Sequence, residues 1–187
     1  MRIISGKFKG KKILKPNDLS TRPLKDLTKE SIFNIIQHSN KFKINFENSK
    51  ILDLFSGTGS FGIECISRGA KFVDFVENYE GILPVLKRNL TNLNSISNYS
   101  IIEEDIFKNF NLKNLNKEYD IIFLDPPYNE KKLYEIISQI VNEKILKQKG
   151  IIILHRHKKQ IDNLPDQIKI LEEKKYGISK ILFCNIS

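Results

Sequence analysis

Short apolar runs alternate with longer amphipathic stretches from residue 50 onward. We interpret the runs as strands at 50–55, 71–77, 99–104, 119–125 and 150–154. The stretches between them predict helices near 60–69, 80–93 and 130–147. This alternation is typical of βαβ units in a parallel sheet. Runs such as "IIFL" and "IIIL" lack polar positions, as expected for strands that are covered on both faces.

The two ends of the chain have other patterns. "IKILEEKKYGISKILFCNI" holds two apolar runs around Tyr176-Gly177, which predicts an antiparallel hairpin that closes the sheet. "RIISGKFKGKKILKP" interleaves apolar and basic residues with two glycines and predicts a small twisted β-hairpin. Residues 25–38, after Pro23, have apolar positions at mostly helical spacing and predict a helix. The predicted fold is therefore α/β, with a mostly parallel seven-stranded sheet.

Composition bounds the class of protein. The chain has 187 residues, 40% of them hydrophobic and 28% charged, which predicts one globular domain with an appendage. No apolar run approaches the roughly 20 residues that span a bilayer, and the first residues form no apolar signal core, so we expect a cytoplasmic protein without a membrane partner. Cys65 and Cys184 lie in apolar segments and are expected to be buried free thiols. His155 and His157 are interpreted as strand-end or surface residues, and no metal site is predicted.

The positive charge is concentrated at one end. Residues 1–43 carry 11 Lys+Arg against 3 Asp+Glu, which is +8 of the net charge of +9. A basic segment on a neutral body indicates a surface for a polyanion, with a solvated lysine-rich tail as the alternative. The predicted phosphate contacts are Arg2, Lys7, Lys9, Lys11 and Lys12. Arg22 is predicted near the substrate, unless it is simply a surface arginine held before a helix by proline.

Polar residues, glycines or prolines directly follow four successive predicted strands. In an open α/β sheet, ligands bind beyond the carboxyl ends of the strands, where the strand order reverses. The candidate ligand-binding residues are therefore those that follow each strand, namely Ser56-Gly57-Thr58-Gly59, Glu77-Asn78, Asp105-Ile106 and Asp125-Pro126-Pro127-Tyr128.

The glycine turn raises the question of which cofactor binds. Gly57, Gly59 and Gly62 have the spacing of a dinucleotide-binding turn, and Glu77 follows twenty positions after Gly57. However, Asp53 stands just before the turn and disfavours a pyrophosphate, whereas it favours the cationic amine and sulfonium of S-adenosylmethionine. Glu77 suits the ribose of either cofactor.

The motif after the fourth strand indicates the acceptor. We interpret it as a site for a flat ring that bears an amine: the Asp125 carboxylate and a backbone carbonyl fixed by Pro126 and Pro127 accept N–H bonds, while Tyr128 stacks on the ring. Such positioning favours attack of the amine on a sulfonium methyl group. The alternative is an ordinary turn with a surface tyrosine.

These motifs together resemble a class I S-adenosylmethionine-dependent methyltransferase of Rossmann-like fold, and specifically the RsmD family, which methylates the exocyclic N2 of a guanine in bacterial 16S ribosomal RNA. The resemblance rests on "RIISGKFKGKKI", "RPLKDLTKESIFNII", "ILDLFSGTGSFGIECISRGA", "VDFVENY", "YDIIFLDPPY" and "YGISKILF". It implies that 1–43 is an RNA-binding extension of a methyltransferase domain at 44–187.

The resemblance also implies a role for each motif. Asp53, Ser56, Gly57 and Gly59 would hold the methionine part of S-adenosylmethionine, and Glu77 would hold the ribose; Asn78 is also expected to bind the cofactor. Asp105 and the backbone of Ile106 would contact the adenine, and the residues from Asp125 to Tyr128 the reacting amine. One departure concerns the first helix, where the family's Asp-Arg-x-Arg-Glu is replaced by Asp26-Leu27-Thr28-Lys29-Glu30. Leucine and lysine cannot reproduce bidentate arginine contacts to RNA.

Other functions stay open at this point. The partner that the resemblance implies is 16S rRNA, within an assembled or assembling 30S particle, and we expect a monomer. A DNA adenine-N6 methyltransferase would also suit "DPPY", and a protein glutamine methyltransferase would usually have Asn at position 125. A nonenzymatic RNA-binding ribosome assembly factor and a small NAD-binding oxidoreductase are the alternatives from other classes.

Overall fold

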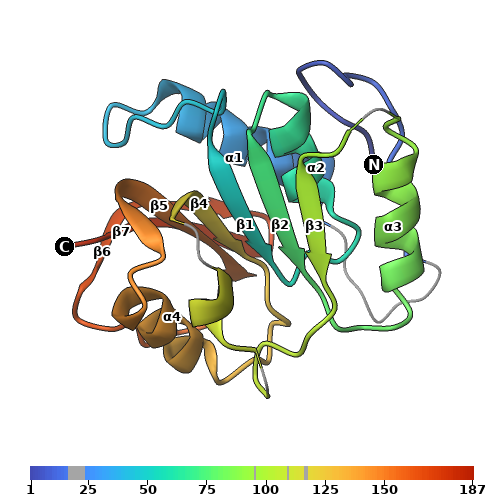
Figure 1. The fold of residues 1–187 in the computed structure, drawn as a ribbon. Helices are drawn as coiled ribbons and strands as arrows, with labels where there is room; N and C mark the ends of the chain where they lie inside the picture. The colour runs from blue at the N-terminus through green and yellow to red at the C-terminus, as the bar shows by residue number, and fades with distance from the viewer. Residues whose placement is uncertain (17–23, 95, 109, 116–117) are drawn as a thin grey trace.

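The chain is built around one seven-stranded sheet in the order β3-β2-β1-β4-β5-β7-β6 (Figure 1). The computed structural model describes residues 1–16, 24–94, 96–108, 110–115 and 118–187. The strands are β1 (Lys50–Leu54), β2 (Phe72–Val76), β3 (Tyr99–Ile102), β4 (Tyr119–Leu124), β5 (Leu146–His157), β6 (Ile168–Tyr176) and β7 (Ser179–Ile186). Strands β1 to β5 pair in parallel, while β7 pairs antiparallel with β5 and β6. The predicted parallel sheet with an antiparallel C-terminal hairpin is confirmed.

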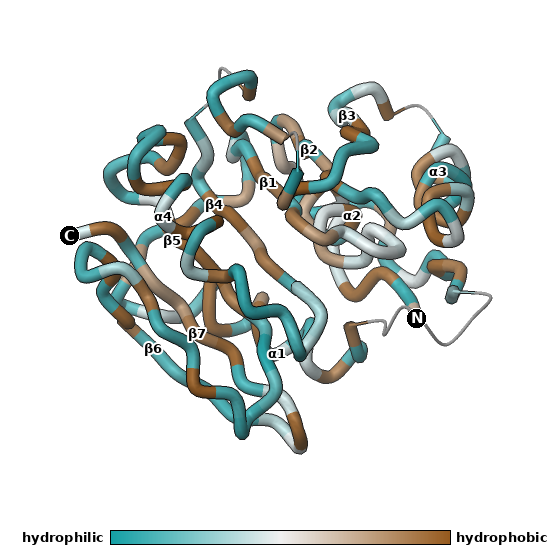
Figure 2. Tube along the Cα trace, turned by 90° about the horizontal axis from the view of Figure 1, so that it is seen from below, coloured by the Kyte–Doolittle hydropathy of each residue, from teal (hydrophilic) through white to brown (hydrophobic). Residues whose placement is uncertain are grey.

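Helices cover both faces of the sheet. They are α1 (Asp26–His38), α2 (Ser60–Ser67), α3 (Leu83–Thr91) and α4 (Leu133–Asn142), with a 3₁₀ turn η1 (Leu112–Leu115). Successive side chains of a strand point to opposite faces, so Ile51 packs with α1, α2 and α3 while Leu52 packs with α4 and η1. Hydrophobic residues accordingly run along the central strands β1 and β4 (Figure 2). This two-sided burial explains why the central strands have no polar alternation.

The boundary between α4 and β5 differs from the prediction. The helix predicted at 130–147 ends at Asn142, and the strand predicted at 150–154 spans Leu146–His157. Lys144 has a left-handed backbone with φ of 51°, which a helix cannot contain. The Tyr119 N–H then donates to the Ile145 carbonyl at 2.7 Å, so the chain is already pairing with β4.

The N-terminal segment forms the predicted small hairpin, in which the N–H groups of Ile3 and Ile13 donate to the carbonyls of Lys11 and Met1 at 2.9 and 3.0 Å. Its ends pair through a single antiparallel bridge, Arg2 with Lys12. The N–H groups of Lys7 and Phe8 donate to the carbonyl and hydroxyl oxygens of Ser67 on α2, at 2.7 and 3.0 Å, instead of pairing across the loop. The loop's apolar residues join the cluster that packs with α1 and α2, namely Ile3, Phe8 and Ile13. The division at residue 43 therefore stays a prediction.

A buried ionic cluster attaches this loop to the helices. The Glu64 carboxylate accepts the N–H groups of Ile4 and Ser5 at 2.7 and 2.9 Å and the Arg68 Nε at 2.9 Å. Lys29 of α1 lies 3.7 Å from Glu64 and is fully buried, and its Nζ donates to the Arg2 carbonyl at 2.8 Å. Burial lowers the pKa of Lys29. Lys29 is thus a buried packing residue that supports the loop and is not available at the surface.

No helix in the described part of the chain is long and apolar enough to cross a membrane.

Candidate functional site

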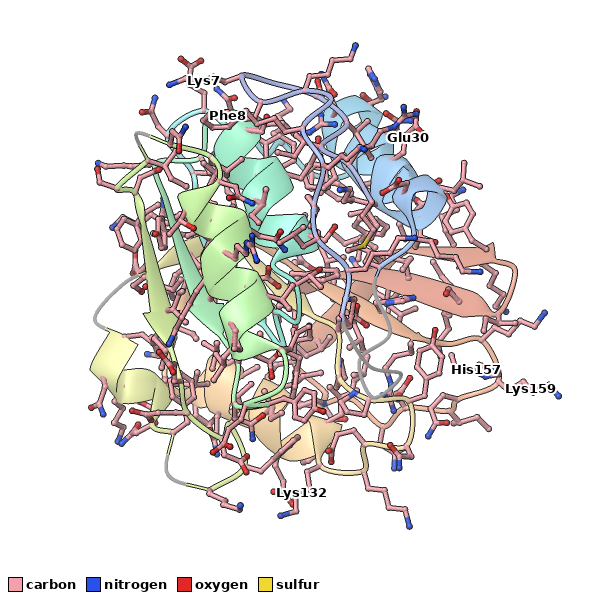
Figure 3. All side chains as sticks on the ribbon, turned by 90° about the vertical axis from the view of Figure 1, so that its right-hand side faces the viewer. Lys7, Phe8, Glu30, Lys132, His157 and Lys159 are labelled. Atoms are coloured by element: carbon pink, nitrogen blue, oxygen red, sulfur yellow. The ribbon has the colours of Figure 1, made fainter. Side chains whose placement is uncertain are left out.

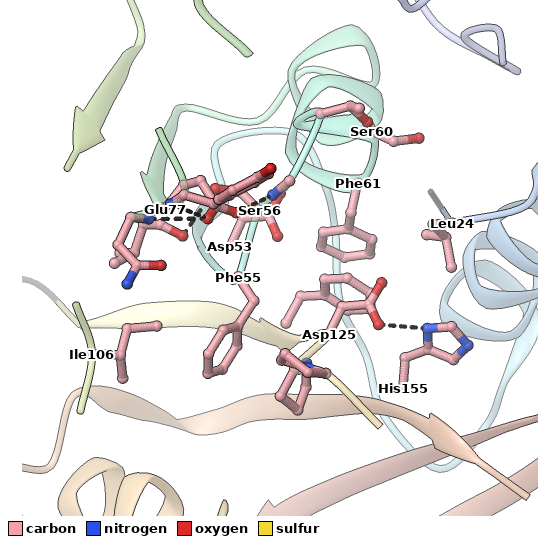
Figure 4. Close-up of a pocket in the computed structure, with 18 of the residues that line it drawn as sticks. Leu24, Asp53, Phe55, Ser56, Ser60, Phe61, Glu77, Ile106, Asp125 and His155 are labelled. Carbon is pink, nitrogen blue, oxygen red and sulfur yellow. Dashed lines mark hydrogen bonds and ion pairs between the residues drawn. The ribbon is translucent and has the colours of Figure 1, made fainter. Parts of the chain in front are cut away.

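A pocket of about 510 Å³ lies beyond the carboxyl ends of β1 to β4. The order of the strands reverses between β1 and β4, which is the place where open α/β sheets bind ligands. All the predicted cofactor and catalytic residues line this pocket except Gly59. Figure 4 shows Glu77 on one side of it and Asp125 on the other.

The glycine turn between β1 and α2 forms one wall of the pocket. Gly57 and Gly59 have φ of 53° and 77°, a left-handed backbone that favours glycine. Although Gly59 does not line the pocket, a Cβ there would lie 2.5 Å from a methyl of Leu86. The Gly57 N–H donates to the Glu77 carboxylate at 2.7 Å. That N–H is thus already paired with a carboxylate, which argues against a pyrophosphate at this turn.

Asp53 is a buried carboxylate beneath the turn. It is 1% exposed and accepts the Gly62 N–H at 2.9 Å. Burial raises the pKa of Asp53 well above its ordinary value of 3.8, and the charges of Asp125 and Glu77 add to this effect. A cation in the pocket would offset the cost of ionising this carboxylate, whereas an anion would increase that cost.

We expect Asp53→Asn to be more stable than the wild type at pH 7 without ligand. An acid whose pKa is raised on folding makes the protein lose stability as pH rises above 3.8, because the unfolded state releases the proton first. Asparagine keeps an oxygen acceptor for Gly62 and has no charge. Urea unfolding from pH 3 to pH 8 checks this, with the exposed Asp166→Asn as control. Parallel pH profiles of wild type and Asp53→Asn would contradict it.

The ends of β2 and β3 supply two more acidic residues. The Glu77 Oε1 accepts the N–H groups of Asn78 and Tyr79 at 3.0 and 2.9 Å. Asp105 accepts the Phe107 N–H at 2.9 Å, which lowers the pKa of Asp105. Both carboxylates therefore fix the backbone of their own loops at the pocket wall. Ile106 is buried beside Asp105.

The 125–128 loop forms the wall opposite Glu77. The Asp125 Oδ1 lies 2.7 Å from the Nδ1 of His155 (Figure 4). The Tyr128 ring meets His155 and His157 edge to face, with centroids 6.0 and 5.3 Å apart. The Tyr128 hydroxyl lies 3.4 Å from the Ser179 Oγ. Asp125, Pro126, Pro127 and Tyr128 are thus brought together at the pocket, as predicted.

His155 is a pocket residue that the sequence analysis missed. Its assignment as a surface or strand-end residue is wrong as to exposure, since it is 6% exposed and lines the pocket. Its Nε2 is buried, and no hydrogen bond to it is found among the described residues. The pairing of Leu124 with Leu154 explains the position, because the next residues of the two strands are Asp125 and His155. His155 also directly follows the predicted strand 150–154, so the rule applied to the other strand ends is the sequence signal that could have identified it.

The predicted RNA contacts lie on an exposed surface away from the sheet. We call this surface the basic loop. All of its cationic residues are exposed, and they are Arg2, Lys7, Lys9, Lys11 and Lys12. The ammonium groups of Lys7 and Lys11 lie 5.3 and 5.2 Å from the centre of the Phe8 ring (Figure 3). Arg22 falls outside the described residues. On α1, Leu27 is 80% exposed, at the position where the family that the chain resembles has an arginine.

Within the described ranges, no group of three or more His, Cys, Asp or Glu side chains could hold a metal ion.

The strand order, together with two carboxylates beside a glycine turn, defines the class of the chain as a Rossmann-like methyltransferase fold. The structure is similar to that of the putative methyltransferase yhhF from Escherichia coli, with a TM-score of 0.80 over 100% of this chain and 97% of that one, at 23% identity.

The sequence comparisons identify the family. The family "Conserved hypothetical protein 95" matches residues 1–185. The ribosomal RNA small subunit methyltransferase D of Buchnera aphidicola subsp. Acyrthosiphon pisum is 36% identical over 92% of this chain and 86% of its own length. The putative rRNA methyltransferase YlbH of Bacillus subtilis is 32% identical over 97% and 96%. The chain therefore belongs to this family, the RsmD family of methyltransferases, as its motifs predicted.

Proposed function

We propose that the chain methylates the exocyclic N2 of a guanine in 16S ribosomal RNA, with S-adenosylmethionine as methyl donor. One observation carries the proposal: the 125–128 loop faces, across one pocket, a glycine turn with two carboxylates beside it. The names of the relatives support ribosomal RNA of the small subunit as the substrate. We infer the N2 amine as the methylated group because the loop has acceptors for an amine and because its motif resembles that of the RsmD family.

The pocket fits S-adenosylmethionine in size and in charge. Its volume of about 510 Å³ is within the usual range for ligand sites. Asp53, next to Ser56, Gly57 and Gly59, would hold the cationic methionine part. Glu77 and Asn78 would bind the ribose, and Asp105 and Ile106 the adenine. A dinucleotide would instead place two phosphate charges among these carboxylates, which are unfavourable neighbours for anions.

The 125–128 loop orients the acceptor. Bound S-adenosylmethionine supplies a methyl group on a positively charged sulfur, and transfer leaves S-adenosylhomocysteine and one proton. Asp125 and the Pro126 carbonyl accept the N–H bonds of the guanine amine, which directs the nitrogen lone pair toward the methyl group. Tyr128 stacks on the base. In this proposal the Asp125 carboxylate, which accepts an N–H of the amine, receives the released proton.

The basic loop supplies the RNA affinity in this proposal. Its exposed cations neutralise phosphates, and Arg22 adds a contact near the substrate. Because the target base must be unstacked to enter the pocket, an assembled 30S particle that already presents it is the proposed substrate. The chain acts as a monomer.

The proposal is tested by transfer of a labelled methyl group from S-adenosylmethionine to 30S particles from a strain that lacks the enzyme. We expect one N2-methylguanosine in 16S rRNA, located by mass spectrometry of nuclease fragments. N6-methyladenine in DNA would establish the alternative methyltransferase. Calorimetry that detects binding of neither S-adenosylmethionine nor NAD would favour the assembly factor, and binding of NAD alone would favour the oxidoreductase.

We expect replacement of Lys7, Lys9, Lys11 and Lys12 by alanine to raise the KM for 30S particles and to leave S-adenosylmethionine affinity unchanged. Each lost phosphate contact reduces the slope of log affinity against log salt by about 0.7 to 0.9. Particle binding at several salt concentrations measures this. A matched control replaces four exposed lysines elsewhere, Lys71, Lys144, Lys149 and Lys169. Equal salt slopes in the two variants would contradict the role of the basic loop.

A further inference from the structure

We propose that two adjacent residues at the end of β5, His155 and Arg156, form a clamp that holds the 125–128 loop in its reactive position. Both are positioning residues, and neither is needed to touch the cofactor. The inference rests on the proposed methyl transfer and extends it, because it explains how an irregular loop can present its acceptors at a fixed place.

The loop cannot hold itself in place by backbone pairing. β4 ends at Leu124, and the Asp125 N–H makes one further bond, to the Leu54 carbonyl, at 3.3 Å. The next two residues, Pro126 and Pro127, have no N–H to donate. With so few backbone hydrogen bonds, the orientation of the Asp125 carboxylate and of the loop carbonyls depends largely on side chains from outside the loop.

His155 holds the loop on the pocket side. Its Nδ1 lies 2.7 Å from the Asp125 Oδ1, and its ring is almost fully buried. This bond restricts the rotation of the carboxylate and leaves its other oxygen for the substrate amine. The rings of Tyr128 and His155 also meet edge to face, with their centroids 6.0 Å apart. One imidazole thus contacts both ends of the acceptor site.

Arg156 holds the loop on the opposite side of the strand, because successive side chains of a strand point to opposite faces. Its guanidinium donates to the carbonyls of Pro127 and Glu130 at 2.9 and 3.1 Å. The Pro127 carbonyl also accepts the Glu130 N–H at 2.9 Å, so both of its acceptor positions are occupied. Arg156 is 1% exposed, and its Nε donates to Asp162 at 2.8 Å, which neutralises the buried charge.

This geometry predicts that loss of either contact lowers kcat more than it weakens cofactor binding. The S-adenosylmethionine residues lie mainly at the ends of β1, β2 and β3, which the clamp does not contact. A shift of about 1 Å at the reacting group is enough to lower a rate by roughly 100-fold. A residue that only stabilised the fold would change kcat and cofactor affinity together through the amount of folded protein.

The test compares variants of similar volume. His155→Asn keeps an N–H near the position of Nδ1, whereas His155→Leu does not; Arg156→Lys keeps the charge and loses the two-pronged donor geometry. The controls are His38→Asn on α1 and Arg88→Lys on α3, both at exposed positions. For each protein we would measure kcat and KM on 30S particles, S-adenosylmethionine affinity by calorimetry, and hydrogen exchange of the amides in 125–131.

We expect His155→Leu and Arg156→Lys to lower kcat by about 10- to 100-fold, with cofactor affinity within about 3-fold, and His155→Asn to retain most of the activity. Amide hydrogen exchange in residues 125–131 should accelerate in His155→Leu and Arg156→Lys and stay unchanged in the controls. Equal kcat in His155→Leu and wild type, or unchanged exchange in Arg156→Lys, would overturn the clamp. If the wild type itself transfers no methyl group, the proposed function fails, and the exchange measurement still decides whether the clamp exists.

Discussion

Replacement of Asp125 by alanine is expected to lower methyl transfer to 30S particles by at least about 100-fold, the lower end of the range for loss of a positioned acceptor. The variant loses the carboxylate that would accept the substrate amine. It also leaves His155 without the partner 2.7 Å away. Initial rates with labelled S-adenosylmethionine measure the effect, and Asp166→Ala, at an exposed position, is the control.

The same variant distinguishes catalysis from binding. Asp125 lies across the pocket from Glu77, so we expect S-adenosylmethionine to bind Asp125→Ala with affinity near that of the wild type. Removal of a nearby negative charge also lowers the cost of ionising Asp53, to whose raised pKa Asp125 contributes. Undiminished methyl transfer by Asp125→Ala would refute the role assigned to Asp125.

The largest effect on stability is expected from Glu64→Ala. Loss of this carboxylate leaves Lys29 as a buried charge without its counter-ion and removes the acceptor of two N–H groups, those of Ile4 and Ser5. Breaking a buried ion pair by removing one partner costs about 3 to 5 kcal/mol. We therefore expect the free energy of unfolding to fall by about that amount in urea titrations.

Two further variants test the cause of this loss. Glu80→Ala removes an exposed carboxylate and should change stability by less than about 0.5 kcal/mol. A second replacement, Lys29→Met, in the Glu64→Ala background removes the uncompensated charge and should recover part of the stability. A loss below about 1 kcal/mol in Glu64→Ala would show that the cluster is hydrated and contributes little.

Much of the fold could be predicted because its strands are short apolar runs separated by amphipathic helices. The pattern fails where local preference and pairing disagree. Residues 143–149 contain good helix formers, yet Leu146 pairs with Tyr119 of β4, and this pairing overrides the helical pattern. The N-terminal hairpin forms but is confined to one bridge, because Glu64 and Ser67 accept the N–H groups of Ile4 and Phe8.

The candidate site was largely predictable because parallel strands gather their carboxyl ends at one edge. Residues directly after a strand, such as Asp125 and Glu77, could therefore be placed without knowing the packing. His155 follows the predicted strand 150–154 and could have been placed by the same rule, whereas the contact of Arg156 with the Pro127 carbonyl depends on the packing of the loop. Lys29 was judged as a replacement for an arginine, and only the packing of α1 on α2 shows that it is buried.

The attachment of the basic loop to α2 has a further consequence. Gly6 approaches so closely that a Cβ there would lie 1.8 Å from the Ser67 carbonyl oxygen, and α2 begins directly after the glycine turn at Gly59. The lysines that we propose as phosphate contacts and the methyl donor would therefore lie on one rigid unit, at a separation fixed before RNA binds. Under the proposed function, this fixed separation would select a nucleotide by its distance from a stretch of RNA backbone, without contacts to the neighbouring bases.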